Sequence, residues 1–114
     1  LAFRRQSEER LVRNFRLDGK HIVITGASSG FGHHFAGVLA AAGARVALGA
    51  RRVDKVAARV DEIRAAGGEA KGLPLDVRSA DSIRAFLAEA ARAFGPVDVV
   101  INNAGVEAGA KTYM

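Results

Sequence analysis

The chain has 114 residues, of which 49% are hydrophobic and 25% are charged, and its formal net charge is +5. This composition is typical of one folded domain and excludes a disordered chain. The absence of cysteine excludes disulfides, thiolate catalysis and cysteine zinc sites. The sequence has no signal-peptide pattern and no apolar run of about 18 residues, so we expect a cytoplasmic protein with no membrane contact.

Residues 1–16 form a basic N-terminal extension that we expect to be helical. Residues 1–20 carry six basic and three acidic side chains. Leu11, Val12 and Phe15 would lie on one side of such a helix. Mixed charge signs are typical of a solvated amphipathic helix rather than a nucleic-acid-binding arm, and no recognition motif accompanies the charge. We therefore expect no nucleic-acid partner, and we expect residues 17–114 to form the folded domain.

From residue 21 onward, short apolar runs alternate with segments of helical periodicity. Each helical segment ends at glycine: the first at Gly43, the second at Gly67 and Gly68, and the third, capped by Ser79, at Gly95,. Pro74 is compatible with a strand only near its start or at the edge of a sheet. The predicted strands are residues 21–25, 45–50, 72–77 and 97–102.

The alternation of strands and helices predicts a Rossmann-type, doubly wound parallel α/β sheet with right-handed crossovers. The runs at 21–25 and 97–102 are continuously apolar, which is typical of strands covered on both faces. If the strand order is 3-2-1-4, the fourth strand is an apolar edge that nothing later in the chain covers. We therefore expect these four strands and three helices to be the N-terminal portion of a longer, incomplete domain.

The segment TGASSGFG, residues 25–32, joins the first predicted strand to the first helix. Glycine permits positive φ and leaves no Cβ between the backbone and a ligand, and the N–H groups of a helix N-terminus favour an anion. A strand before the loop and a helix after it are the context of a dinucleotide fingerprint. A turn without a ligand is the alternative interpretation. The predicted pyrophosphate and ribose contacts are Gly26, Ser28, Ser29, Gly30 and Gly32.

Two other interpretations of this loop are excluded by its residues. A P-loop requires lysine followed by serine or threonine after the last glycine, whereas Gly32 is followed by His33 and His34,. Adjacent histidines project about 100° apart on a helix and do not form the i, i+4 pair used for metal ligation. We therefore expect no metal site.

Arg51 and Arg52 follow the second predicted strand, which ends at Ala50. A carboxylate at this place binds a free ribose 2′-hydroxyl, whereas a 2′-phosphate needs positive charge. The guanidinium offers a planar fork of donors that suits phosphate. We therefore predict that Arg51, together with Arg52, binds the 2′-phosphate of NADP(H), with NAD(H) as the alternative cofactor. A solvated basic start of a helix is the other interpretation.

TGASSGFG, the LDV of residues 75–77 and the NNAG of residues 102–105 together resemble the short-chain dehydrogenase/reductase family. The resemblance covers about residues 17–105. It implies that Asp76 accepts a hydrogen bond from the adenine amine and that Asn102 holds the sheet together. A helix-capping role before Ser79 is the alternative for Asp76. The other cofactor contacts that the resemblance implies are Phe31, in place of the usual isoleucine, the backbone of Val77, and Asn103, Ala104 and Gly105.

The family resemblance also implies hydride transfer that reduces a carbonyl or oxidises an alcohol of a small-molecule substrate, in a homo-oligomeric protein. In the family, a serine and a Tyr-x-x-x-Lys pair on one helix face carry out proton transfer. Residues 1–114 contain no such pair, because Lys111 and Tyr113 stand in the reverse order and only two residues apart,. We therefore assign no catalytic residue to this chain. A non-catalytic dinucleotide-binding or structural module is the alternative function.

Overall fold

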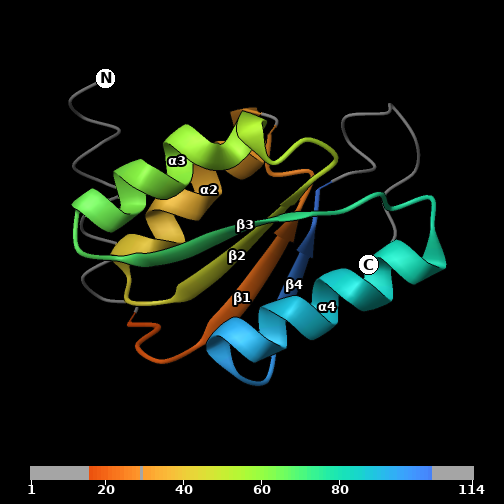
Figure 1. Cartoon of the computed structure of the whole chain (residues 1–114). Coiled ribbons are helices and arrows are strands. Elements are labelled where there is room, and N and C mark those ends of the chain that lie inside the picture. Colours follow the sequence, from red (N-terminus) through yellow and green to blue (C-terminus); the bar gives the residue numbers. More distant parts are fainter. Residues whose placement is uncertain (1–15, 29, 104–114) are drawn as a thin grey trace.

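Four parallel strands alternate with three helices along the chain (Figure 1). The computed structural model describes residues 16–28 and 30–103. The elements are β1 (His21–Thr25), α2 (Gly30–Ala41), β2 (Arg45–Ala50), α3 (Asp54–Ala65), β3 (Glu69–Pro74), α4 (Ala80–Phe94) and β4 (Val99–Asn102). The strand order β3-β2-β1-β4 confirms the predicted doubly wound α/β fold. The predicted N-terminal helix lies, except for Arg16, outside the described residues.

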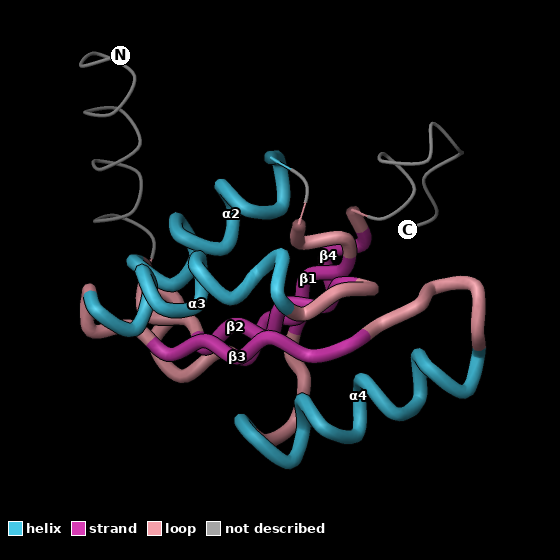
Figure 2. Tube along the Cα trace, turned by 45° about the horizontal axis from the view of Figure 1, so that its top comes forward, coloured by secondary structure: helices cyan, strands magenta, loops and turns pink. Residues whose placement is uncertain are grey.

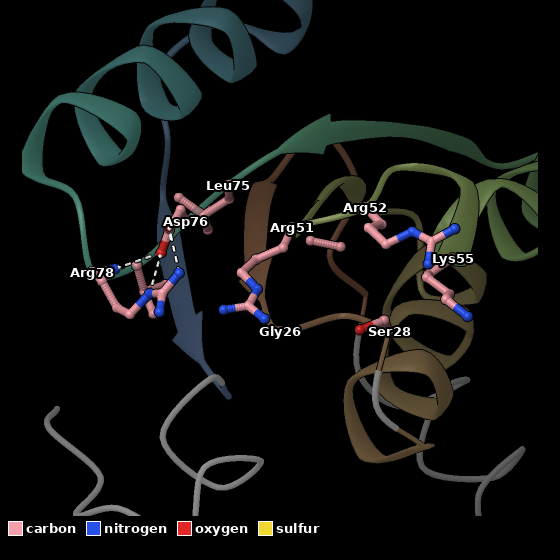
Figure 3. Close-up of a pocket in the computed structure, with 10 residues that line it drawn as sticks. Gly26, Ser28, Arg51, Arg52, Lys55, Leu75, Asp76 and Arg78 are labelled. Atoms are coloured by element: carbon pink, nitrogen blue, oxygen red, sulfur yellow. Dashed lines mark hydrogen bonds and ion pairs between the residues drawn. The ribbon is translucent and has the colours of Figure 1, made fainter.

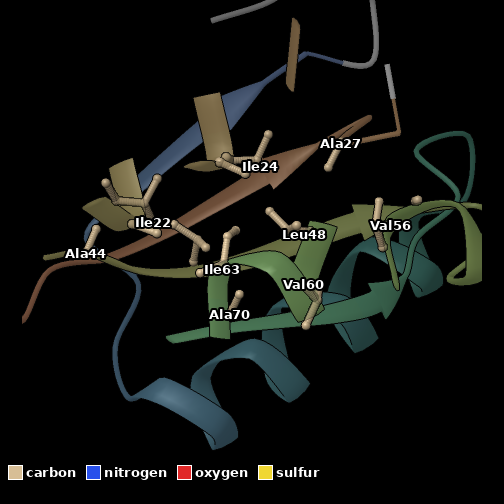
Figure 4. Close-up of a cluster of buried hydrophobic side chains, with 13 residues drawn as sticks. Ile22, Ile24, Ala27, Ala44, Leu48, Val56, Val60, Ile63 and Ala70 are labelled. Carbon is tan, nitrogen blue, oxygen red and sulfur yellow. The ribbon is translucent and has the colours of Figure 1, made fainter. Parts of the chain in front are cut away.

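The helices cover both faces of the sheet, with α2 and α3 on one face and α4 on the other (Figure 2). Successive strand residues point to opposite faces. Ile22 and Ile24 therefore pack in the core under α2 and α3 (Figure 4), whereas Val23 packs with Phe86 and Ala90 of α4. All five residues of β1 are buried. The apolar run of β1 thus reflects two separate cores, as the sequence predicts for a central parallel strand.

The third strand begins earlier than predicted, at Glu69 rather than at Gly72, and ends at Pro74. The predicted range 72–77 was wrong because it followed the apolar residues. β3 is an edge strand in which Ala70 is buried in the core under α2 and α3 and Leu73 is buried against α4, while Glu69, Lys71 and Pro74 are exposed. Its register with β2 pairs Arg45 with Glu69 and Ala50 with Pro74. After one more backbone bond, from Leu75 to Ala50, the chain leaves the sheet. The segment that follows, residues 76–78, therefore forms a loop at the carboxyl end of the sheet.

The fourth strand is shorter and more exposed than predicted. It covers Val99–Asn102 rather than residues 97–102, and Val99 and Val100 are 45% and 54% exposed. The expectation that this strand is covered on both faces was wrong. β4 pairs with β1 on one side only, in a register that begins with Ile22 opposite Val99. Within the described residues it is the outer strand of the sheet, which agrees with the predicted strand order.

We predict that the 114-residue chain self-associates through β4. An apolar outer strand presents unpaired N–H and C=O groups that pair readily with another edge. Size-exclusion chromatography with light scattering should therefore show dimers or larger species. Replacing Val99 and Val100 by lysine should restore a monomer, because lysine on an edge opposes strand addition. Ala88→Lys, an equally exposed position on α4, is the control. A monodisperse wild-type monomer that melts cooperatively would contradict the prediction.

No helix within residues 16–28 and 30–103 has both the length and the apolar character needed to cross a membrane.

Candidate functional site

A pocket of about 480 Å³ opens at the carboxyl ends of β1, β2 and β3 (Figure 3). In open α/β sheets this is the edge at which ligands bind. Three loops build the pocket, one after each strand, so residues separated by more than fifty positions become neighbours. Its lining residues are Gly26, Ser28, Ala50, Arg51, Arg52, Lys55, Leu75, Asp76, Val77 and Arg78.

Gly26 and Gly32 are required by the fold of the loop itself. Gly26 has φ of +63°, a conformation that side chains with a Cβ rarely adopt. A Cβ on Gly32 would lie 2.9 Å from Nδ2 of Asn103, 3.1 Å from Cα of Ala27 and 3.2 Å from the carbonyl oxygen of Gly26. The first glycine therefore permits the turn, and the third lets helix α2 pack against it.

Gly30 is different, because neither its conformation nor its neighbours require glycine. Its φ lies outside the left-handed region, and a Cβ built there would meet no atom of the described residues within 4 Å, apart from its chain neighbours and its own helix. Gly30 is exposed and begins helix α2, where free N–H groups favour an anion. The missing side chain leaves open space in front of those N–H groups. This arrangement fits a phosphate group that approaches the backbone.

Asn102 and Asn103 connect the end of β4 to the glycine loop through Thr25. The Thr25 hydroxyl donates to Oδ1 of Asn102 at 2.9 Å and accepts from the backbone N–H of Asn103 at 3.1 Å. The Asn103 side chain is buried, and its Nδ2 donates to the Gly26 carbonyl oxygen at 3.1 Å. Asn102 thus joins β4 to β1. Asn103 supports the loop, a contact that the sequence did not indicate.

Four basic side chains line the pocket, and they differ in their partners. Arg52 donates to the Asp54 carboxylate at 3.0 and 3.3 Å. Arg51 and Lys55 form no hydrogen bond or ion pair with any residue of the described part of the chain. In Figure 3, Arg51 lies near the middle of the pocket, between Asp76 and Arg52, and Lys55 lies beside Arg52 at one side of the pocket. The sequence indicated Arg51 and Arg52, but Lys55 was missed.

Among the described residues that line the pocket, Asp76 is the single carboxylate, and it accepts hydrogen bonds from Arg78. The Arg78 side chain donates from Nε to Oδ1 at 3.1 Å and from Nη2 to Oδ2 at 3.2 Å, and the Arg78 backbone N–H donates to Oδ1 at 3.0 Å. These side-chain and backbone hydrogen bonds lower the pKa of Asp76, and the charge of Arg51 acts in the same direction. Asp76 is therefore a charged acceptor at the pocket.

The loop that carries Asp76 is fixed to the start of helix α4. Ser79 caps the helix by accepting from the backbone N–H of Ser82 at 3.2 Å, which confirms the predicted cap. The Ser82 hydroxyl in turn accepts from the backbone N–H of Asp76 at 2.8 Å. The helix-capping acid considered for Asp76 was wrong, because its carboxylate accepts from Arg78 instead.

Arg78→Gln should raise the pKa of Asp76 toward the ordinary carboxyl value, because the variant loses the guanidinium that holds the carboxylate. A lowered folded-state pKa stabilises the fold above the unfolded-state value of about 3.9, and this stabilisation is lost as the pH falls through the folded-state pKa. A carbon-13 NMR titration of the Asp76 carboxyl measures the shift. Arg92→Gln, on the last turn of α4, is the control. An Asp76 that titrates at the same pH with and without Arg78 would contradict this assignment.

The pocket brings together six of the predicted cofactor contacts: Gly26, Ser28, Arg51, Arg52, Asp76 and Val77. Gly30, Gly32 and Phe31 lie at the start of α2, next to the loop rather than in the pocket lining. Phe31 is 61% exposed and packs edge-on against Phe35 at 4.7 Å between ring centroids. The remaining predicted contacts, Ser29, Ala104 and Gly105, lie outside the described residues.

Two charged pocket residues, Lys55 and Arg78, were missed by the sequence analysis. A signal for each was present. Lys55 follows Arg51 by four residues, in the first turn of the helix after the second strand, and Arg78 follows Asp76 by two residues in the loop after the third strand. Neither Lys55 nor Arg78 belongs to a family motif, so comparison with the motifs did not identify them. Among the described residues, no group of three histidine or acidic side chains could hold a metal ion.

A parallel sheet in the order β3-β2-β1-β4, with a glycine turn before the first helix, defines a Rossmann-type α/β protein,. The family model for short chain dehydrogenases matches residues 20–113. The chain therefore belongs to the short-chain dehydrogenase/reductase family.

Relatives of known sequence or structure agree with this assignment. The uncharacterized oxidoreductase YxbG of Bacillus subtilis is 44% identical over 92 residues, which are 81% of this chain and 34% of that protein. A metagenomic short-chain oxidoreductase in complex with NADP is 45% identical, with a TM-score of 0.69 over 74% of this chain and 38% of its own. A structure from Haemophilus influenza with bound NAD is 28% identical, with a TM-score of 0.76 over 79% of this chain and 32% of its own. The chain spans about a third of the length of the curated relatives it matches.

Proposed function

We propose that this chain is the cofactor-binding part of an NADP(H)-dependent oxidoreductase that reduces a carbonyl or oxidises an alcohol of a small molecule. The observation that carries the proposal is Arg51, an unpaired guanidinium in the described structure, at the end of β2 where an NAD(H) site would place a carboxylate,. The preceding residue, Ala50, supplies no acid. When bound, the nicotinamide would supply the hydride for reduction of a carbonyl, or accept it in oxidation of an alcohol.

Different residues of the loop and pocket would bind different parts of the cofactor. The N-terminus of α2 at Gly30 would bind the pyrophosphate, with Ser28 and Ser29 as hydroxyl donors. Asp76 would accept from the adenine amine, next to the backbone of Val77. The remaining cofactor contacts would come from Phe31, under the cofactor, and from Asn103, Ala104 and Gly105, which would line the adenosine ribose.

The relatives support a nicotinamide dinucleotide without deciding which one. One structural neighbour contains NADP and another contains NAD. The local charge supports the phosphorylated form, because the described pocket lining has four basic side chains, of which Arg52 is paired with Asp54 and Arg78 with Asp76, which leaves a net charge of +2. A 2′-phosphate carries a charge of about −2 near neutral pH. Electrostatic attraction therefore favours NADP(H) over NAD(H).

The proposed reaction also needs proton transfer, for which the family uses its Tyr-x-x-x-Lys pair. Residues 1–114 contain no such pair. We therefore propose residues 17–114 as an incomplete Rossmann domain, with the acid/base groups in the remainder of a longer, homo-oligomeric protein. On this chain, cofactor binding can therefore be measured, whereas turnover cannot.

The direct test compares NADPH and NADH binding to the chain. Because the two differ only by the 2′-phosphate, isothermal titration calorimetry at fixed ionic strength isolates that group. We expect NADPH to bind at least about tenfold more tightly, a difference of about 1.4 kcal/mol. Equal affinities would contradict the assignment of NADP(H), and binding of neither would contradict the dinucleotide site.

A further inference from the structure

Lys55 is a pocket residue to which neither the family motifs nor the sequence pattern assigns a role. It lies in the first turn of α3, four residues after Arg51 in the sequence. Its side chain is exposed, and it has no hydrogen bond or ion pair to any residue that the structure describes. In Figure 3 its ammonium group lies on the side of the pocket that carries Ser28.

The other basic side chains of the pocket divide into compensated and uncompensated charges. Arg52 is paired with Asp54, and Arg78 is paired with Asp76. Each of these pairs is nearly neutral as seen by an approaching anion. Arg51 and Lys55 are the two cations of the described pocket lining that form no ion pair with a carboxylate, although the charge of Arg51 also acts on Asp76.

From this arrangement we propose that Arg51 and Lys55 together bind the 2′-phosphate, and that Arg52 does not. The inference rests on the proposed preference for NADP(H) and names the residues responsible for it. Two uncompensated cations match a phosphate monoester, whose charge is about −2 near neutral pH. The residues also have complementary chemistry, because the Arg51 guanidinium is a directional fork of donors and the Lys55 ammonium is a compact point charge on a flexible stem.

The ion pair between Arg52 and Asp54 explains why the sequence position of Arg52 wrongly suggests a phosphate-binding role. Arg51 and Arg52 are adjacent, so the sequence treats them alike. In the structure the Arg52 guanidinium turns to the Asp54 carboxylate at the start of α3. Lys55 lies in the same turn but keeps its charge available to the pocket.

The test uses adenosine 2′,5′-bisphosphate and 5′-AMP, which differ only in the 2′-phosphate, titrated calorimetrically into the 114-residue chain. We expect Lys55→Gln to weaken the bisphosphate about tenfold while changing 5′-AMP less than about twofold. Arg52→Gln should change neither ligand by more than about twofold. Lys20→Gln, which removes the same charge beside β1 at the opposite end of the sheet, is the control. Lys55→Arg should retain the wild-type affinity.

Four outcomes would overturn the inference. In the first three, Lys55→Gln leaves the bisphosphate affinity unchanged, Lys55→Gln weakens both ligands equally, or Arg52→Gln weakens bisphosphate binding as much as Lys55→Gln does. If the wild-type chain favours the bisphosphate in any of these cases, the NADP(H) proposal stands and only the role of Lys55 fails. Equal wild-type affinities for the two ligands would overturn both. Far-UV circular dichroism confirms that each variant is folded.

Discussion

Arg51→Glu should reverse the cofactor preference, so that the variant binds NADH more tightly than NADPH. The side chain stands at the end of β2 and lines the pocket. A glutamate there would repel the 2′-phosphate and could accept a hydrogen bond from the free 2′-hydroxyl of NADH. Charge-assisted hydrogen bonds contribute about 1.5–3 kcal/mol each. NADPH affinity should therefore fall on the order of 100-fold, with little loss of NADH affinity.

Fluorescence or calorimetric titration with both nucleotides measures this reversal. Lys20→Glu makes the same change of charge at the far end of the sheet and should leave the ratio of affinities near the wild-type value. Because Arg51 is exposed and unpaired in the described structure, both variants should melt close to the wild-type temperature. A preference that persists in Arg51→Glu would show that other groups select the cofactor.

Gly30→Ala and Gly32→Ala should separate ligand binding from folding, although the two glycines are only two residues apart. A Cβ on Gly30 meets no neighbouring side chain or loop among the described residues, so alanine should leave stability unchanged or raise it by up to about 0.5–1 kcal/mol. The same methyl group would enter the space in front of the α2 N-terminus. Dinucleotide affinity should therefore fall by about tenfold or more.

Gly32→Ala should instead destabilise the fold. Its Cβ would press on the Asn103 side chain at 2.9 Å and on the backbone of the Gly26 turn. Overpacking of this kind costs about 1–3 kcal/mol, which exceeds the gain of about 0.5–1 kcal/mol from alanine in a helix. Binding should weaken together with stability, because Asn103 also holds the Gly26 carbonyl.

Thermal melts and NADPH titrations on the same two variants measure both quantities. The expected pattern is a stable Gly30→Ala that binds poorly and an unstable Gly32→Ala. The proposed anion site at the start of α2 would be refuted by a Gly30→Ala variant with wild-type affinity for NADPH. A Gly32→Ala variant as stable as the wild type would contradict the packing role.

The sequence by itself determined the fold class, because the period of the apolar residues differs between strands and helices. β1 and β2 occupy their predicted ranges, Ser79 caps α4, and the alternation of strands and helices predicted the parallel doubly wound sheet. The glycine loop was equally predictable, since the geometry of a strand-to-helix turn leaves few residue choices. The family motifs pointed to residues on three loops, and the structure brings those loops to one edge.

Tertiary structure alone decided which charges in the pocket are available. Arg51 and Arg52 look equivalent in the sequence, but Arg52 pairs with Asp54 and Arg51 does not. Lys55 carries no motif and enters the pocket because the first turn of α3 faces it. The exposure of β4 likewise depends on its place at the edge rather than on its apolar residues. A side chain's partners are set by the folded chain in three dimensions, whereas sequence periodicity records only which side of its own element each residue occupies.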